Sequence, residues 1–310
     1  MISVDDKQFA HFGEQRSNGS LPPRIHIGTP MKIKGSIKRL LKRSSFIVDA
    51  VRTARAGAED IKKLYGFMIR SRQIERYFSD SAIKKVQLGT SHSLIAGWLN
   101  TDLLPSNPEV VYLDATRRFP FKDSTIDYVF SEHVIEHVEY QSGLAMLREC
   151  YRVLKPGGKI RMSTPDLRVL VGLFSSEKTA SQNFYIDFAT RKFLPDITYC
   201  KEVFVTNNAF RAWGHQFLYD RQTIETTMRT IGFENIRYYR PGESDDENLR
   251  GIESHGRVMG CEEINQFEAF AVEGDVPHMK EQNGDAVAKP ASAVPSEIVS
   301  SDPEAIATTS

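Results

Sequence analysis

Residues 124–166 read STIDYVFSEHVIEHVEYQSGLAMLRECYRVLKPGGKIRMSTPD, and this stretch decides the fold. It holds an apolar run, a polar cluster with two histidines, an amphipathic segment, a Pro-Gly-Gly turn and a second apolar run. That order predicts a strand, a loop, a helix, a turn and a strand, the repeating unit of a parallel sheet with crossover helices. The cluster Ser131-Glu132-His133 follows the first strand, at the edge where open α/β sheets bind ligands.

Around this unit the sequence predicts an α/β fold with a seven-stranded, mostly parallel sheet and helices on both faces. The expected strands are residues 83–89, 99–104, 110–115, 126–131, 159–163, 236–240 and 267–272. The expected helices are 141–154, 167–174 and 219–231, with Asp166 and Asp220 as caps. The first two strands are too close for a full crossover helix, so that connection is a single turn or irregular.

The flanking segments differ in character from this core. Residues 1–30 lack periodicity and are expected to be a flexible lead, and residues 275–310 lack aromatics and are expected to be a disordered tail. Residues 31–82 are rich in Lys and Arg and predict two basic amphipathic helices, an N-terminal helical extension. This extension either packs on the main domain or lets residues 31–76 contact an anionic surface.

Composition excludes several classes of protein. The 310 residues are 40% hydrophobic and 26% charged with zero formal net charge, so we expect a soluble protein without a nucleic-acid partner. No apolar run is long enough for a membrane span or secretory signal, which predicts a cytoplasmic location. The cysteines (Cys150, Cys200 and Cys261) lack metal-ligand spacing and are expected to be reduced thiols.

Two acidic residues end successive strands. Asp102 is placed to accept hydrogen bonds from a ribose diol, and Asp114 from an exocyclic amine such as that of adenine. Taken singly, each can also be a turn or cap residue. A nicotinamide enzyme fits poorly, because the full GxGxxG is absent and Asp102 follows Gly89 too closely for that fingerprint.

An ordered set of motifs resembles the class I S-adenosylmethionine-dependent methyltransferases, and most closely their type 11 group. The motifs are Gly89, Gly97-Trp98-Leu99-Asn100-Thr101-Asp102, Asp114-Ala115, Phe119-Pro120-Phe121 with Asp123-Ser124 and Asp127, Glu132-His133-Val134-Ile135-Glu136-His137, and Leu154-Lys155-Pro156-Gly157-Gly158. The GW-x-N-x-D run is similar to a subgroup with a short first crossover that often lies beside polysaccharide genes. The resemblance covers about residues 84–173 and continues more weakly through 215–273, within a domain at 83–274 whose residues 175–213 look like an insertion or lid.

This resemblance implies a Rossmann-like fold, S-adenosylmethionine as cofactor and methyl transfer to a small or saccharide-like acceptor, at oxygen. It also implies cofactor-binding residues: Gly89, Thr90 and Ser91 under the methionine part, Asp102 at the ribose, Asp114 and Ala115 at the adenine, and Ser131, Glu132 and His133 on the floor below the sulfonium. The family reads Leu-Gly-Cys-Gly where this chain has Leu88-Gly89-Thr90-Ser91. Loss of the second glycine adds a Cβ or demands a positive φ from serine, so a non-catalytic binding module is the alternative.

The histidines are the candidate bases for a methyl acceptor. His133 and His137 are the predicted catalytic residues, and the C-terminal loops can deliver His215 or His255; a structural, hydrogen-bonded histidine is the alternative for each. Residues 133–137 also match HxxEH, an inverted zinc-protease motif. That motif needs a helix, whereas His133 directly follows a strand and no third ligand stands out, so we expect no metal.

Overall fold

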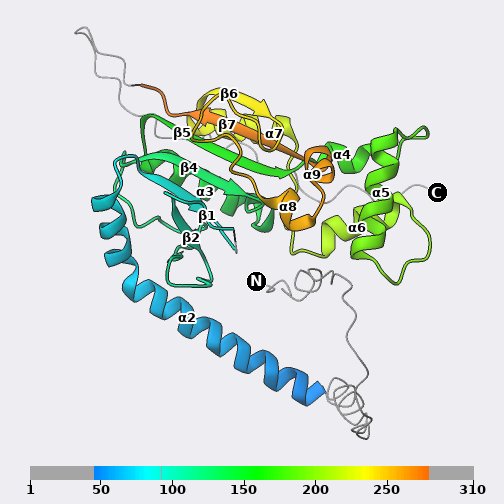
Figure 1. The fold of residues 1–310 in the computed structure, drawn as a ribbon, viewed down its shortest axis with the longest axis horizontal. Helices are drawn as coiled ribbons and strands as arrows, with labels where there is room; N and C mark the ends of the chain where they lie inside the picture. The colour runs from blue at the N-terminus through cyan, green and yellow to red at the C-terminus, as the bar shows by residue number, and fades with distance from the viewer. Residues whose placement is uncertain (1–44, 92, 279–310) are drawn as a thin grey trace, which may run out of the picture. The chain divides into compact units, whose positions relative to one another are not determined.

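The computed structural model describes residues 45–91 and 93–278, which form a seven-stranded sheet of order β3-β2-β1-β4-β5-β7-β6 (Figure 1). The strands are β1 (Lys85–Leu88), β2 (Leu99–Asp102), β3 (Val111–Tyr112), β4 (Ile126–Glu132), β5 (Leu154–Pro165), β6 (Glu234–Tyr239) and β7 (Ala269–Asp275). Strands β1 to β5 are parallel, and β7 runs antiparallel to both β5 and β6. The predicted seven-stranded, mostly parallel sheet is confirmed.

The strand order reverses at β1, which pairs with β2 on one side and with β4 on the other. In the β1–β4 register Leu88 lies opposite Ser131, so the turn at Gly89 and the pair Glu132-His133 leave the sheet side by side. Between β1 and β2 the described residues form turns and no helix, as the short spacing predicted. This reversal is the point at which open α/β sheets hold ligands, beyond the carboxyl ends of their strands.

Helices α3 (Tyr140–Val153) and α7 (Arg221–Ile231) pack against one face of the sheet. Met146 and Leu147 of α3 and Met228 of α7 are fully buried in the main core. Asp220 caps α7 by accepting a hydrogen bond from the backbone N–H of Thr223 at 2.8 Å, and Gly232 ends the helix with φ 119°. Both helices were predicted from their apolar stripes and end signals.

The other face of the sheet is covered in part by a loop. Trp98, Phe130 and Leu249 form a small buried cluster there. Beside it the fully buried Arg161 of β5 pairs with Glu253 and Glu273, each at 2.6 Å. This ion-pair cluster anchors the segment after β6 to the sheet.

A second group of helices lies at one end of the sheet (Figure 1). It comprises α4 (Leu167–Gly172), α5 (Ala180–Phe193), α6 (Glu202–Arg211), α8 (His255–Met259) and α9 (Glu262–Glu268). Leu170, Tyr185, Val205 and Met259 bury one another in a separate core. Only α4, capped by Asp166, was predicted; residues 175–213 contain α5 and α6, and α8 and α9 lie in what was expected to be a polar loop.

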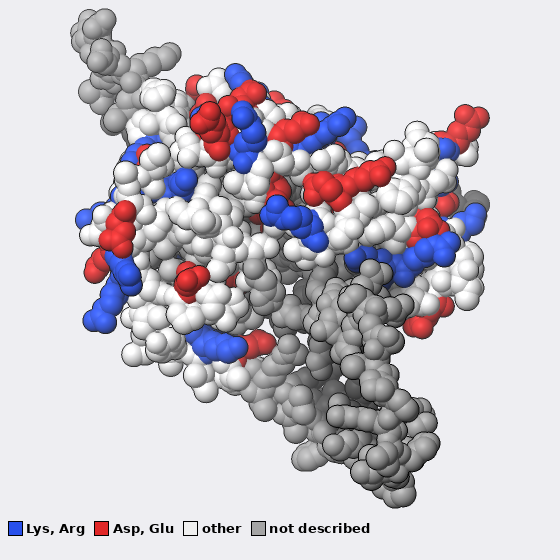
Figure 2. Space-filling view, viewed as in Figure 1, with Lys and Arg blue, Asp and Glu red and all other residues white. Residues whose placement is uncertain are grey.

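The N-terminal extension is a single helix over its described part, α2 (Ser45–Asp80), and not two helices. Residues 52–60 are rich in Ala and contain no proline, so nothing in that stretch breaks the helix. Its last turns pack on the domain: Ile74 is buried, and Phe78 stacks on Phe121 with ring centroids 6.2 Å apart. On the face that Figure 2 shows, acidic and basic side chains are interspersed.

Several predictions lie at or beyond the described boundaries. The lead (1–30), residues 31–44 of the basic arm and residues 279–310 of the tail lie outside the described residues.

Strand β5 begins at Leu154, so the Pro-Gly-Gly turn forms an irregular start of the strand, where Gly157 has φ 80°. Within the described part, no helix is both long and apolar enough to cross a membrane.

Candidate active site

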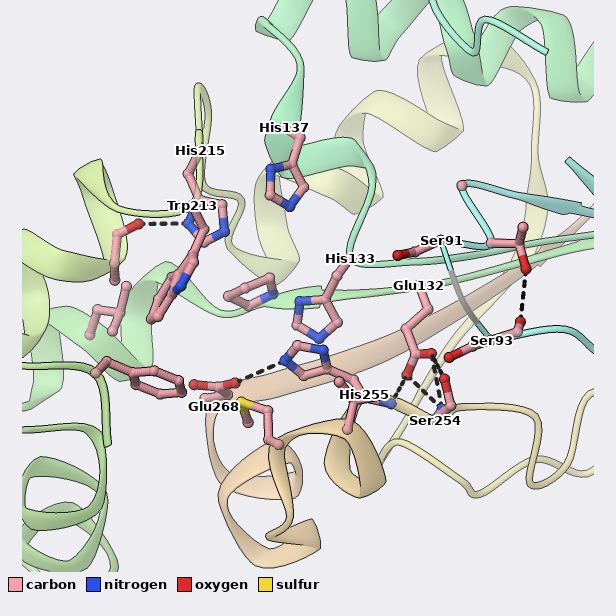
Figure 3. A pocket seen from close by; sticks show the side chains of 18 of the residues that line it. Ser91, Ser93, Glu132, His133, His137, Trp213, His215, Ser254, His255 and Glu268 are labelled. Carbon is pink, nitrogen blue, oxygen red and sulfur yellow. Dashed lines mark hydrogen bonds and ion pairs between the residues drawn. The ribbon is translucent and has the colours of Figure 1, made fainter. Parts of the chain in front are cut away.

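A cavity of about 370 Å³ lies at the carboxyl ends of β1 and β4 (Figure 3). The turn after β1 and the residues around the end of β4 form one part of its lining, and residues of helices α4, α5, α6, α8 and α9 and of the segment after α6 form most of the rest. Of the predicted site residues it brings together Gly89, Thr90, Ser91, Glu132, His133 and His137. Asp102, Asp114, Ala115 and Ser131 do not line it; Ser131 is buried within β4.

The turn after β1 keeps its shape without a second glycine. Gly89 has φ 67°, and a Cβ added there would lie 2.4 Å from Cγ2 of Val134, so only glycine fits. Ser91 adopts φ 48°, the left-handed conformation that a glycine would otherwise supply, at a cost of about 1–2 kcal/mol. The backbone N–H of Ser91 donates to Oδ2 of Asp102 at 2.8 Å. This bond joins the turn to the acid at the end of β2.

The two strand-end acids are held by local hydrogen bonds. Oδ1 of Asp102 accepts from the backbone N–H of Leu104 at 2.8 Å. Oδ1 of Asp114 accepts from the backbone N–H of Thr116 at 2.9 Å, and its carboxylate also faces Arg117 at 3.3 Å. Both carboxylates are therefore fixed in direction on neighbouring connections of the sheet.

Glu132 has partners that the sequence did not reveal. Its carboxylate accepts hydrogen bonds from the backbone N–H and hydroxyl of Ser254 and from the backbone N–H of His255, at 2.8–2.9 Å. The imidazole of His255 consequently stacks on His133 with ring centroids 3.8 Å apart (Figure 3). The end of β4 and the start of α8 thus form one wall of the cavity.

His133 and Glu136 form a buried pair, with Nδ1 of His133 2.9 Å from Oε1 of Glu136. Burial alone would lower the pKa of His133, but the hydrogen bond to Glu136 and its charge raise it to about 9. Burial would likewise raise the pKa of Glu136, whereas the contact with His133 lowers it to about 2. Nε2 of His133 has no hydrogen-bond partner among the described residues, although the side chain lines the cavity.

The imidazoles of His255 and His215 favour the neutral form. Burial lowers the pKa of His255 well below its usual value, and the charge of His133 adds to this effect. Burial also lowers the pKa of His215, whose Nδ1 lies 2.6 Å from the carbonyl oxygen of Ala209. The rings of His215 and His137 lie on one wall of the cavity, with centroids 4.9 Å apart (Figure 3).

The sequence did not predict the aromatic wall of the cavity, formed by Tyr185, Phe193 and Trp213, or the nearby Glu268. Phe193 and Trp213 meet edge to face with centroids 5.0 Å apart, and Tyr185 and Glu268 line the cavity nearby. Residues 175–213 were expected to form an insertion or lid, but their weak periodicity gave no means of placing its aromatic side chains. Glu268, at the end of α9, carried no sequence signal at all.

Residues 86–162 match the model of a family described as a methyltransferase domain, the type 11 group. This span holds the turn after β1, both strand-end acids and the His133–Glu136 pair. Over these residues the chain carries a methyltransferase domain, and S-adenosylmethionine is the cofactor that this domain implies.

Solved structures similar to this chain were also found, whereas no curated protein matches its sequence. A methyltransferase from Archaeoglobus fulgidus has 16% identity over 69% of this chain and 94% of its own, with a TM-score of 0.35. A Haloferax volcanii complex between a methyltransferase activator and a chain described as a methyltransferase is also similar. Its sequence identity is 13%, the match covers 74% of this chain and 96% of the other, and the TM-score is 0.37. The third is a Haemonchus contortus phosphoethanolamine N-methyltransferase bound to phosphomonomethylethanolamine and S-adenosylhomocysteine. Its sequence identity is 15%, the match covers 67% of this chain and 53% of the other, and the TM-score is 0.35.

The residues of this chain fit S-adenosylmethionine. The bond between Ser91 and Asp102 places a ribose-type acceptor beside the turn that would carry the methionine part. The turn faces the cavity directly, at the reversal point of the sheet. The positive φ of Ser91 also shows that serine can occupy the position where the missing glycine raised the question of a degenerate turn.

Proposed function

We propose that this methyltransferase transfers a methyl group to an oxygen of a small polar acceptor, with hydroxyl-bearing, saccharide-like rings as the first class to test. The observation that carries the proposal is a continuous cavity that begins at the Gly89–Ser91 turn and ends among imidazole and aromatic side chains (Figure 3). A cofactor at the turn would direct its sulfonium toward those side chains. An acceptor bound among them would then lie in line for displacement.

The cofactor assignments follow the chain's own geometry. S-adenosylmethionine supplies an activated methyl group when bound. The backbone of Gly89, Thr90 and Ser91 would support its methionine part, and Asp102 its ribose. Asp114 and Ala115, one connection further along the sheet, would face the adenine, while the buried Ser131 would shape the floor below Glu132 and His133.

An oxygen acceptor is favoured by the imidazoles at the cavity. A hydroxyl must lose its proton as the C–O bond forms and the C–S bond breaks, so a nearby proton acceptor accelerates the reaction. His133 is better placed for this than His137, because Glu136 fixes its Nδ1 and its Nε2 has no other partner among the described residues. The hydroxyl proton would pass to Nε2 of the neutral form of His133; because its pKa is raised to about 9, this form becomes more populated as pH rises, and the transfer rate should rise with it.

A ring-shaped acceptor is favoured by the aromatic wall. Trp213, Phe193 and Tyr185 offer apolar surfaces against which the C–H face of a sugar ring can pack. These residues come from the segment 175–213, which we propose acts as the lid of the acceptor site. Hydroxyl groups at the ring edge would meet the polar side chains opposite.

The test is a transfer assay with S-adenosylmethionine labelled at the methyl group. The full chain is incubated with monosaccharides and oligosaccharides, with amino sugars as matched comparators that offer both nitrogen and oxygen. We expect methyl ethers as products, and we expect His133→Asn to lower kcat by about 10²- to 10⁴-fold with little change in S-adenosylhomocysteine affinity. Methylation confined to nitrogen, or an unchanged kcat in His133→Asn, would contradict the proposal.

A further inference from the structure

Three side chains near the acceptor end of the cavity meet at one point. Glu136, His137 and His215 each offer a ligand atom, and these atoms all lie within 4.8 Å of one another. Ligand atoms around one zinc ion stand about 2.0–2.2 Å from it and thus roughly 3–4 Å apart. Small side-chain rotations would therefore allow the three groups to share one ion.

The ligand atoms are already oriented by neighbouring groups. Nδ1 of His215 lies 2.6 Å from the carbonyl oxygen of Ala209, so it carries the proton and leaves Nε2 with its lone pair. The hydroxyl of Thr164 donates to Oε2 of the fully buried Glu136 at 3.1 Å, and Nδ1 of His133 holds Oε1. Metal-binding histidines and carboxylates in proteins have outer partners of this kind.

The donor set indicates the class of metal. Two imidazole nitrogens and one carboxylate oxygen suit zinc and its first-row neighbours, whereas magnesium and calcium prefer oxygen ligands alone. Three protein ligands leave at least one coordination position open, the arrangement of catalytic sites. His137 and His215 both line the cavity, so the open position would face the acceptor.

We propose that Glu136, His137 and His215 bind one divalent first-row transition-metal ion, such as Zn²⁺, beside the methyl acceptor. The ion would coordinate the acceptor hydroxyl, lower its pKa and fix its oxygen toward the sulfonium. This part of the inference rests on the proposed function, and the binding of the metal does not. The site also changes the expectation drawn from the HxxEH motif, because His215 supplies the third ligand that the sequence did not reveal.

Cobalt is the probe for the first experiment. The full chain is treated with a chelator, dialysed and titrated with Co²⁺ while visible absorption and calorimetric heat are recorded. We expect one site per chain with the visible bands of cobalt bound by nitrogen and oxygen, and displacement of cobalt by Zn²⁺. Absence of these bands, with the heat of free-solution mixing only, would overturn the proposal.

Variants locate the site. His137→Ala and His215→Ala should each weaken Co²⁺ binding by about 100-fold or more, and Thr164→Val, which keeps shape but removes the bond to Glu136, by about 10- to 100-fold. His278→Ala is the matched control, because this exposed histidine lies outside the cavity lining and should leave affinity unchanged. Thermal melting confirms that each variant is folded. Unchanged binding in the folded double variant His137→Ala/His215→Ala would place the cobalt elsewhere and refute the assignment.

A parallel titration with S-adenosylhomocysteine separates the two proposals. Cofactor-product binding without cobalt binding would reject the metal site and leave the methyl-transfer proposal standing. Cobalt binding lost in His137→Ala, without any S-adenosylhomocysteine binding at the turn, would support the metal site and reject the proposed use of the cavity.

Discussion

Glu132 and Ser254 are joined by hydrogen bonds from both the backbone N–H and the hydroxyl of Ser254 to the Glu132 carboxylate, at 2.9 Å. The bonds connect the end of β4 to the residue before α8. They bring His255 against His133 and so help to shape the cavity. Glu132 lines the cavity and also holds the start of α8 in the same wall.

Replacing Glu132 by Gln should loosen this connection. A neutral amide offers only one acceptor oxygen to the N–H groups of Ser254 and His255, so we expect a loss of about 1–3 kcal/mol in the free energy of unfolding. Hydrogen exchange of the amides in α8 should accelerate. Ser254→Ala, which removes only the hydroxyl bond, should cost about 0.5–1.5 kcal/mol. Equal exchange rates in the wild type and Glu132→Gln would show that the link does not hold α8.

In the turn after β1, we expect substitutions at Gly89 and Ser91 to change the free energy of unfolding in opposite directions. Gly89→Ala should destabilise the fold by about 1–3 kcal/mol, because the new Cβ meets Val134 and the positive φ is strained. Ser91→Gly should relieve the strain at φ 48° and keep or raise stability, within about 1 kcal/mol. Urea denaturation measures both. A marked loss in Ser91→Gly would mean that the serine side chain stabilises the turn.

Replacing Arg161 should strongly destabilise the fold. Arg161→Met leaves the buried carboxylates of Glu253 and Glu273 without their cation, and we expect a loss of about 3–5 kcal/mol. The triple variant Arg161→Met/Glu253→Gln/Glu273→Gln should recover part of this loss, because no buried charge remains. The denaturation midpoint gives the comparison. A single variant within 1 kcal/mol of the wild type would show that water reaches the cluster.

Lowering the pH should reduce the free energy of unfolding, in part because Glu149 becomes protonated. Hydrogen bonds from Arg152 lower the pKa of Glu149 in the folded protein, so its contribution is complete above the usual glutamate pKa and is lost as pH falls through the lower folded value. Between about pH 6 and pH 3 the free energy of unfolding should fall, and it should fall less steeply in Glu149→Gln. Identical slopes for the two proteins would contradict this coupling.

The sequence predicted the elements whose burial pattern is local. Strands β1, β2 and β4 and helices α3 and α7 carry clear periodicity and end signals, so their existence followed from residue order alone. Helices α5, α6, α8 and α9 did not, because they are short or weakly patterned and bury mixed aromatic and small residues against one another. Tertiary packing decides such segments, and single-sequence periodicity does not detect it.

The residues of the candidate site likewise fall into those that the sequence predicted and those that only the tertiary structure revealed. Glu132 and His133 were predicted because they follow a strand at the ligand-binding edge of the sheet, and Gly89 because the family resemblance implies it; all three line the cavity. Trp213 and Glu268 approach from distant segments, and no local pattern marks them. The proximity of His215 to Glu136 depends on how the segment before α7 folds back over the sheet edge, where Gln216 donates its backbone N–H to the carbonyl oxygen of Glu136.

A crystal structure of the full chain with S-adenosylhomocysteine tests the central claim most directly. We predict that the methionine part lies over the Gly89–Ser91 turn, that the ribose hydroxyls meet Asp102, and that the sulfur faces the cavity beside His133. A ligand bound elsewhere, or a sulfur directed away from His133 and the aromatic wall, would contradict the account.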